Sequence, residues 1–231
     1  MLYGVGTKIV ISIILNTYDT SRVQRHMTQQ CIACIRKYTD GDYELILVDN
    51  EPTMDFYHEY DVYKPYVYIE VTPKENVYAS YNRGAKAAKG DVLVFIQNDV
   101  FVHERTINKL EKYLSQYDMV FPQQYPITRD EVKAINKLED GVLSEIGQRD
   151  AGLLMIKREA FEKAGGWDDR FRNLLGERAF YSRCDRAGVS WIDKTNAFIT
   201  HIMAGNNLRK DEQLYNEEMD FDAKLIAKEY S

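Results

Sequence analysis

Two side chains that can bind divalent metal ions follow predicted buried strands. Asp99 comes after the apolar run Val92–Ile96, and His201 directly follows the apolar segment Ala197–Thr200. A carboxylate at a strand end can ligate a hard cation beside a diphosphate, and an added imidazole suits Mn²⁺ or a similar ion. Each residue also has a structural interpretation, Asp99 as a turn cap and His201 as a packed histidine. The pair predicts a metal site only if both side chains reach one crevice.

A second group of polar residues follows the first two predicted strands. Thr17 and Tyr18 come after the strand Lys8–Leu15, and Asp49 follows the strand Tyr43–Val48. An ionised carboxylate at that place can accept hydrogen bonds from a nucleotide base or a ribose, or it can cap the next turn. Because ligands of parallel sheets bind beyond the carboxyl ends of the strands, we expect these residues and Asp99 to line one crevice.

Glu177 is the candidate catalytic base. It stands at the start of a predicted helix, directly after Leu174-Leu175-Gly176. A hydroxyl group is a weak nucleophile and needs a positioned base to take its proton. The alternative explanation is that the helix dipole favours a carboxylate at this end. The residue type and position leave both interpretations open.

Two other patterns do not predict a site. Cys31-x-x-Cys34 lies inside an amphipathic helix, on the face that also carries Met27 and Ile35, which favours core packing over metal or redox chemistry. Gly4-x-Gly6 precedes the first strand instead of following it, so it is not a dinucleotide-binding fingerprint.

Strands and helices alternate through the first hundred residues. The predicted strands are Lys8–Leu15, Tyr43–Val48, Val67–Val71 and Val92–Ile96. One helix is capped by Asp19, Thr20 or Ser21 and runs to about Tyr38, and a second covers Asn76–Lys89. The strands are short, apolar on both faces and rich in isoleucine and valine, as buried parallel strands are. The order predicts an α/β fold with a mostly parallel, doubly wound sheet and helices on both faces.

The rest of the chain is less regular and is expected to extend the same sheet. The predicted helices are Thr106–Gln116, Arg158–Ala164, Glu177–Ala187 and Asp211–Glu229. The predicted strands are Met119–Phe121, Gly152–Lys157, Ser190–Asp193 and Ala197–Thr200. The polar segment Pro122–Gly147 indicates a loop with one or two short helices. With neither an internal repeat nor a linker in view, residues 1–231 are expected to form a single domain.

Composition excludes several classes of protein. The 231 residues are 45% hydrophobic and 29% charged, which excludes a disordered or low-complexity chain. The net charge of −6 argues against nucleic-acid binding by bulk charge. Three cysteines fit a reducing compartment. No apolar run approaches the roughly 20 residues of a membrane span, and the start lacks a signal-peptide pattern. We therefore expect a cytoplasmic protein, with peripheral membrane contact and self-association left open.

A series of segments carries a family resemblance. In order they are Ile11–Asp19, Glu44–Asn50, Asn76–Asp91, Val92–Val100, Ala151–Phe161 with Gly165–Phe171, Gly176-Glu177 and Thr200-His201. Their order and spacing resemble family 2 glycosyltransferases of the GT-A fold. Each motif alone is weak, but seven in the right order over nearly the whole chain are specific. The resemblance implies one GT-A domain, with a nucleotide-sugar-binding half at about 8–100 and an acceptor-side half with the C-terminal helix at about 101–231.

The resemblance also implies ligands and residue roles. The donor would be a nucleotide-diphosphate-sugar, the cofactor a divalent metal, Mn²⁺ or Mg²⁺, and the acceptor a glycan, lipid-linked glycan, protein or nucleic acid. The nucleotide-sugar site would comprise Thr17, Tyr18, Asp49, Asn82, Arg83, Gln97 and Asn98. The metal would be held by Asp99 and His201, and the acceptor side would include Trp167 and Asp168.

Two departures from the family pattern keep alternatives open. Gln97 replaces the first aspartate of the DxD triplet, and Arg178 stands where the usual base aspartate follows the glutamate. The base of an inverting displacement is then Glu177, Asp150 or another acid. The alternatives are a retaining transferase resembling the polypeptide N-acetylgalactosaminyltransferases, a non-catalytic sugar-nucleotide-binding protein, and a transferase acting on nucleic acid.

Overall fold

A seven-stranded sheet forms the centre of the molecule. The computed structural model describes residues 10–18, 21–50, 52, 67–127, 152–172, 175–202 and 212–230. The sheet has the order β3-β2-β1-β4-β8-β6-β9. Its strands are β1 (Ile11–Thr17), β2 (Tyr43–Asn50), β3 (Val67–Val71), β4 (Val92–Gln97), β6 (Met119–Val120), β8 (Leu153–Lys157) and β9 (Trp191–Ile192). Only β8 runs against its neighbours within this sheet, so the predicted mostly parallel, doubly wound sheet is confirmed.

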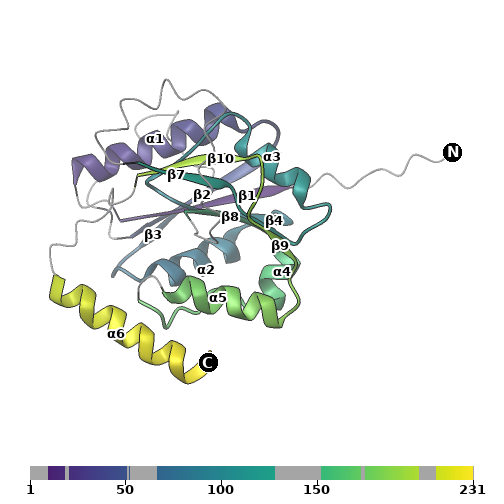
Figure 1. Ribbon diagram of the computed structural model, residues 1–231. Coiled ribbons are helices and arrows are strands. Elements are labelled where there is room, and N and C mark those ends of the chain that lie inside the picture. Colours follow the sequence, from purple (N-terminus) through teal and green to yellow (C-terminus); the bar gives the residue numbers. More distant parts are fainter. Residues whose placement is uncertain are drawn as a thin grey trace.

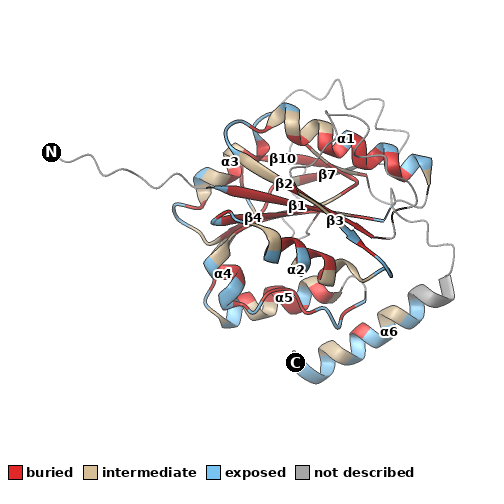
Figure 2. Cartoon of the chain, turned by 180° about the vertical axis from the view of Figure 1, so that it is seen from behind, coloured by how far each residue is buried: buried red, intermediate tan, exposed pale blue. Residues whose placement is uncertain are grey.

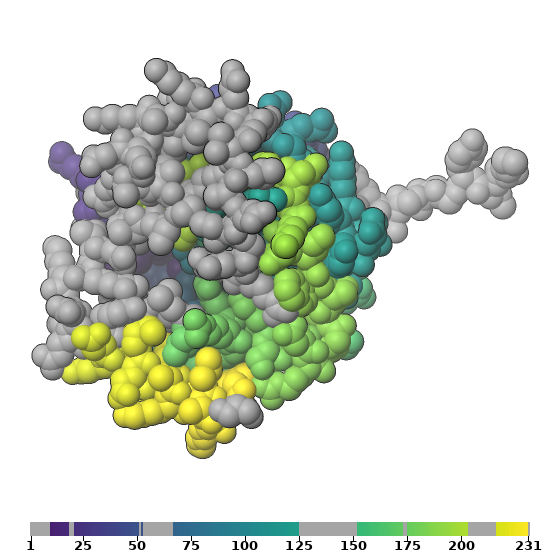
Figure 3. Space-filling view, in the orientation of Figure 1, coloured from purple at the N-terminus to yellow at the C-terminus, as the bar shows by residue number. Residues whose placement is uncertain are grey.

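Helices cover both faces of the sheet (Figure 1). On one face lie α1 (Arg22–Tyr38), α3 (Thr106–Tyr113) and a small second sheet of β5 (Val100–Val102), β10 (Phe198–Ile202) and β7 (Gln123–Ile127). On the other face lie α2 (Val77–Ala87), α4 (Arg158–Lys163) and α5 (Leu175–Arg186). Helix α6 (Glu212–Glu229) lies outside this layer and contacts α5. The space-filling view shows α6, in yellow, against the green segments of the second half (Figure 3).

Alternating side chains of the central strands build two cores, one on each face. Ile14 of β1 packs towards α2, while its neighbours Ile13 and Leu15 pack towards α1. Successive side chains of a strand point to opposite faces, so a strand between two helical layers must be apolar throughout. Figure 2 shows the central strands almost entirely buried. The uniformly apolar runs of the sequence therefore have a direct structural cause.

Helix starts follow local capping chemistry. Ser21, one of the three predicted caps, accepts a hydrogen bond from the backbone N–H of Gln24 at 3.3 Å and begins α1. Asn76 accepts from the backbone N–H groups of Tyr78 and Ala79, both at 3.0 Å, and begins α2. Each side chain satisfies amide donors that have no partner within the helix.

Several expected elements differ from the structure. Residues 123–127 were expected in a loop, yet they form β7, which pairs in parallel with β10. The prediction was wrong because the sequence QQYPI has no alternating apolar pattern. The segment becomes a strand because its backbone pairs with β10. Helix α5 begins at Leu175, so Glu177 lies inside the first turn. The candidate base Asp150, the caps Asp19 and Thr20, and residues 128–147 lie outside the described residues.

Within the part of the chain that the structure describes, no helix is long and apolar enough to cross a membrane.

Candidate functional site

The carboxyl ends of β1, β2 and β4 bring three of the predicted site residues together. Thr17 is paired in register with Asp49 at the ends of β1 and β2. The amide of Asn98, just after β4, donates to the hydroxyl oxygens of Thr17 at 3.2 Å and Thr28 at 2.8 Å. All four side chains are buried. Asn98 therefore fastens the end of β4 to β1 and α1, at the position where the strand order changes direction and where ligands of such sheets bind.

Asp99 and His201 meet because β5 pairs with β10. His201 is the register partner of Val100, and the backbone N–H of Ile202 donates to the backbone oxygen of Asp99 at 3.0 Å. This antiparallel pairing places His201 Nε2 3.5 Å from Asp99 Oδ1. Gly152 leaves the space for the imidazole, since a Cβ there would lie 3.2 Å from His201 Nδ1 and 2.9 Å from a Val100 methyl. The two predicted metal ligands thus face each other across the sheet boundary.

The hydrogen-bonding pattern of Asp99 and His201 favours a cation between Asp99 Oδ1 and His201 Nε2. The carboxamide oxygen of Gln124 can only accept, so the contact of 3.1 Å makes His201 Nδ1 the donor. In the neutral imidazole, Nε2 then carries a lone pair facing Asp99 Oδ1, which is buried and makes no hydrogen bond to any described residue. Two ligands of one small divalent ion lie roughly 3.0–3.4 Å apart, close to the observed separation. A divalent metal fits these residues.

Two of the predicted nucleoside residues, Asp49 and Tyr18, lie at or just after the ends of β2 and β1. Asp49 is almost fully buried, and its Oδ2 accepts a hydrogen bond from the Tyr68 hydroxyl at 2.9 Å. Tyr18 is the most exposed of the set, and the ammonium of Lys74 lies 3.9 Å from the centre of its ring. A fixed carboxylate beside an exposed aromatic ring can take hydrogen bonds and stacking from a nucleoside.

Asn50 organises the same edge and was not singled out from the sequence. Its amide nitrogen donates to Asn16 Oδ1 and Ser80 Oγ, both at 2.8 Å. Its amide oxygen accepts from the backbone N–H of Glu75 at 3.1 Å. One side chain therefore joins the end of β1, helix α2 and the loop before α2. Only the buried position of an asparagine directly after Asp49 could have signalled this role.

Glu177 lies in the first turn of α5, next to two tyrosines of α2. Gly176 lies directly against Tyr78: a Cβ on Gly176 would be 2.3 Å from the Tyr78 ring. Burial raises the pKa of the Tyr78 and Tyr81 hydroxyls, and the nearby charge of Glu177 raises both further. The charge of Asp99 also raises the pKa of the Tyr81 hydroxyl. Arg178 is exposed to solvent.

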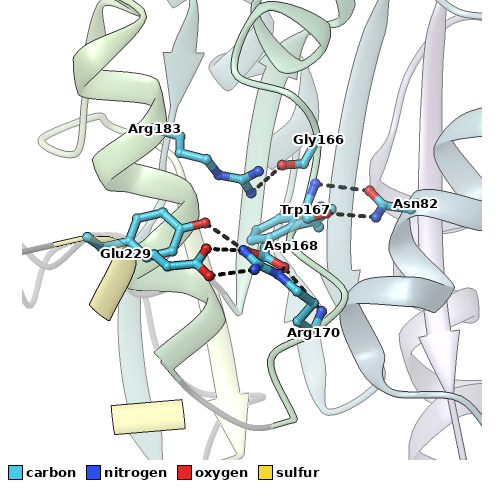
Figure 4. Close-up of polar contacts among 8 residues, drawn as sticks. Asn82, Gly166, Trp167, Asp168, Arg170, Arg183 and Glu229 are labelled. Carbon is cyan, nitrogen blue, oxygen red and sulfur yellow. Dashed lines mark hydrogen bonds and ion pairs between the residues drawn. The ribbon is translucent and has the colours of Figure 1, made fainter. Parts of the chain in front are cut away.

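Four residues predicted for donor or acceptor contacts make contacts within the protein. The Asn82 amide bonds the backbone of Trp167 twice, accepting from its N–H at 2.9 Å and donating to its oxygen at 2.8 Å (Figure 4). The Trp167 ring is a core side chain, 3% exposed and with its centre 4.2 Å from that of the Phe180 ring. Arg83 is half exposed and pairs with Glu75 at 2.8 Å. The backbone N–H of Gln97 donates a hydrogen bond to the backbone oxygen of Gly152 at 3.0 Å.

Asp168 is engaged in an ion-pair network with the C-terminal helix. Arg170 donates to its two carboxylate oxygens at 2.9 and 2.7 Å and also to Glu229 of α6 (Figure 4). The Tyr230 hydroxyl adds a bond of 2.7 Å to Asp168 Oδ2. Burial raises the pKa of Asp168, but the Arg170 and Tyr230 hydrogen bonds outweigh it and hold the value at about 2. The expected acceptor-side carboxylate therefore anchors α6 in this structure.

A cavity of about 770 Å³ lies away from these residues. It is lined at the amino end of β4 and beside α3 and α4, among others by Asp91, Leu114 and Arg158. Its lining includes both acidic and basic side chains, and it shares no residue with the ends of β1, β2 and β4. We therefore place the candidate site at the carboxyl ends of the strands, where Thr17, Asp49 and Asp99 gather, and not at this cavity.

Two solved structures have a similar fold. TarS of S. aureus (residues 1–349) superposes with a TM-score of 0.63 at 10% identity, covering 85% of this chain and 61% of that one. A mannosyltransferase, PcManGT from Pyrobaculum calidifontis, in complex with GDP-Man and Mn²⁺, superposes with a TM-score of 0.67 at 15% identity, covering 96% and 65%. The chain thus spans less than two thirds of either structure.

Sequence comparison gives the family. No curated protein sequence matches the chain. The profile described as Glycosyl transferase family 2 matches residues 12–175, which include the ends of β1, β2 and β4 with Asp49 and Asp99, whereas Glu177 and His201 lie beyond the match. The chain belongs to glycosyl transferase family 2, with the GT-A fold.

Proposed function

We propose that this protein is a metal-dependent glycosyltransferase, moving a sugar from a nucleotide-diphosphate-sugar to an acceptor hydroxyl with inversion. One observation carries the proposal. Asp99 Oδ1 is buried without a hydrogen bond from any described residue and lies 3.5 Å from His201 Nε2, at the carboxyl edge shared with Thr17 and Asp49. Family membership supports the reaction class.

The donor would bind across the ends of β1 and β2. Asp49, held by Tyr68, would accept hydrogen bonds from the base or ribose, and Tyr18 would stack on the nucleoside. Thr17 and Asn98 would contribute chiefly by fixing the two strand ends, since their side chains bond each other. The mannosyltransferase PcManGT is in complex with GDP-Man and Mn²⁺, which puts both first among the ligands to test.

Asp99 and His201 would hold the divalent metal. No group of three or more His, Cys, Asp or Glu ligands occurs among the described residues, so water and diphosphate oxygens would complete the shell, as is usual for Mg²⁺. When bound, such an ion stabilises the negative charge that develops on the diphosphate leaving group. Gln124 would orient His201 by accepting a hydrogen bond from its Nδ1–H, a contact of the kind that metal-binding histidines commonly make.

Glu177 would act as the base. Its carboxylate would accept the proton of the acceptor hydroxyl while that oxygen attacks the sugar carbon from the face opposite the diphosphate. Direct displacement of this kind inverts the configuration. Asp150 is the second candidate base. Determination of the product anomer by NMR separates this proposal from the retaining alternative, and a bound donor that is neither transferred nor hydrolysed would support the non-catalytic alternative.

Thermal stabilisation tests the donor site without a known acceptor. UDP, GDP, dTDP and CDP would each be added with and without Mn²⁺ to the wild type and to Asp99→Asn. A ligand at 100 times its Kd stabilises the folded state by about 2.7 kcal/mol. We expect one nucleotide to raise the melting temperature only with Mn²⁺, and the Asp99→Asn substitution to abolish that rise.

Asp91→Asn is the matched control, because Asp91 is an exposed aspartate at the opposite end of β4. It should keep the full metal-dependent rise. A rise that is equally large without Mn²⁺, or that persists in Asp99→Asn, would overturn the metal assignment. The absence of any rise in a folded wild type would overturn the donor site.

A further inference from the structure

The turn at residues 165–170 is held by both halves of the molecule. From the donor half, Asn82 of α2 makes the paired bonds to the Trp167 backbone, at 2.8 and 2.9 Å. At the start of the same helix, its N-cap Asn76 donates to the backbone oxygen of Asp169 at 2.7 Å. Helix α2 is thus hydrogen-bonded to this turn at its N-cap and at its middle.

Helix α5, which carries Glu177, is fastened to the same turn and to the same helix. Arg183 donates to the backbone oxygen of Gly166 at 2.6 Å (Figure 4). Gly166 has a φ of +68°, and a Cβ there would lie 3.1 Å from Asn82 Oδ1, so the turn is shaped around the Asn82 amide. Tyr78, one helical turn before Asn82, packs against Gly176. Residues four apart lie on one helix face, so a single face of α2 contacts both the turn and the start of α5.

We propose that Asn82 is a positioning residue that keeps Glu177 in register with the donor site, a role that rests on the proposed function. Asn82 is hydrogen-bonded to the Trp167 backbone, and the adjoining Gly166 carbonyl accepts a hydrogen bond from Arg183. Because Arg183 belongs to α5, these bonds connect Asn82 to the helix that carries Glu177. The amide oxygen and one amide hydrogen of Asn82 are both used in this link, so the residue acts through the turn instead of touching the diphosphate.

This role predicts that loss of the Asn82 link affects turnover but not nucleotide binding. The hydrogen bonds that hold Asp49, Thr17 and Asn98 at the strand ends do not involve Asn82, whereas the Asn82 link fixes the position of α5 and hence of the base relative to the donor. A displacement of about 1 Å in a catalytic group costs up to roughly 100-fold in rate. Loss of the link should therefore reduce turnover and leave nucleotide affinity almost unchanged.

The test compares Asn82→Ala with Lys86→Ala, an exposed residue on the same helix. Affinities for GDP and UDP with Mn²⁺ would be measured by calorimetry, and turnover by slow hydrolysis of GDP-mannose and UDP-glucose. We expect Asn82→Ala to lower turnover roughly 10–100-fold with nucleotide Kd changed less than about 2-fold, and Lys86→Ala to change neither. Arg183→Met breaks the same link from the α5 side and should give the same pattern, including where Asn82→Ala folds poorly.

Amide hydrogen exchange gives a readout independent of any donor. Exchange at the Trp167 N–H and in the first turn of α5 should be faster in Asn82→Ala than in the wild type and in Lys86→Ala. A rise in nucleotide Kd that matches the fall in turnover would make Asn82 a direct ligand and overturn the proposal, as would unchanged turnover. If the wild type binds no nucleotide, the proposed function fails, and unchanged exchange in α5 would then separately overturn the link.

Discussion

Replacing Asp168 by asparagine tests how the C-terminal helix is anchored. The variant removes the negative charge that accepts bonds from Arg170 and Tyr230, and leaves Arg170 paired with Glu229. The pKa of Asp168 falls from 3.8 to about 2 in the folded protein. At about 1.4 kcal/mol per pKa unit, this depression gives an upper bound of about 2.5 kcal/mol of stability near neutral pH.

Solvent reduces that bound. The Arg170 side chain is 50% exposed, and pairs with an exposed partner are screened. We therefore expect Asp168→Asn to lower the free energy of unfolding by about 1 kcal/mol at pH 7. Because the folded pKa is depressed, the stabilisation is complete above the unfolded value of 3.8 and is lost as the pH falls through about 2.

Urea denaturation of the wild type and the variant at pH 7, 5 and 3 measures this difference. Asp169→Asn is the control, since Asp169 is exposed, and its effect should stay within about 0.5 kcal/mol. The gap between wild type and Asp168→Asn should be constant from pH 7 to pH 5 and smaller at pH 3. A gap that stays the same down to pH 3, or an equal effect of the control, would refute the ion-pair explanation.

Two further substitutions test the packing around the candidate base. Gly176→Ala would place a Cβ 2.3 Å from the Tyr78 ring and 2.9 Å from Phe171 Cβ, so we expect a loss of about 1–3 kcal/mol in urea denaturation. An unchanged midpoint would contradict the close approach of α2 and α5. The Tyr81 hydroxyl is buried without a hydrogen bond from any described residue, so Tyr81→Phe should be neutral or stabilising by up to about 1 kcal/mol. A clear loss of stability there would mean that the hydroxyl is bonded.

Local patterns predicted the parts of the fold that are decided by burial. The runs that became β1, β2 and β4 are apolar on both faces because a helical layer covers each face of the sheet. Short β5 and polar β7 were not predicted, because neither has a periodic pattern of its own and both exist by pairing with β10. The acidic residues after the strands were predictable as a group, since the carboxyl ends of parallel strands share one edge.

The sequence by itself determined the order of elements, the family resemblance and the edge at which Thr17, Asp49 and Asp99 gather. Only the tertiary structure decided what individual side chains do. Asp168 meets Glu229 through Arg170, 59 residues from Glu229 along the chain, and Asn82 meets Trp167 across 85 residues. Such partners come from distant elements packed on the same face of the sheet, and no local pattern specifies them. Hydrophobic periodicity reports which face is buried, whereas the use of a polar side chain depends on the single atom that packing brings within bonding distance.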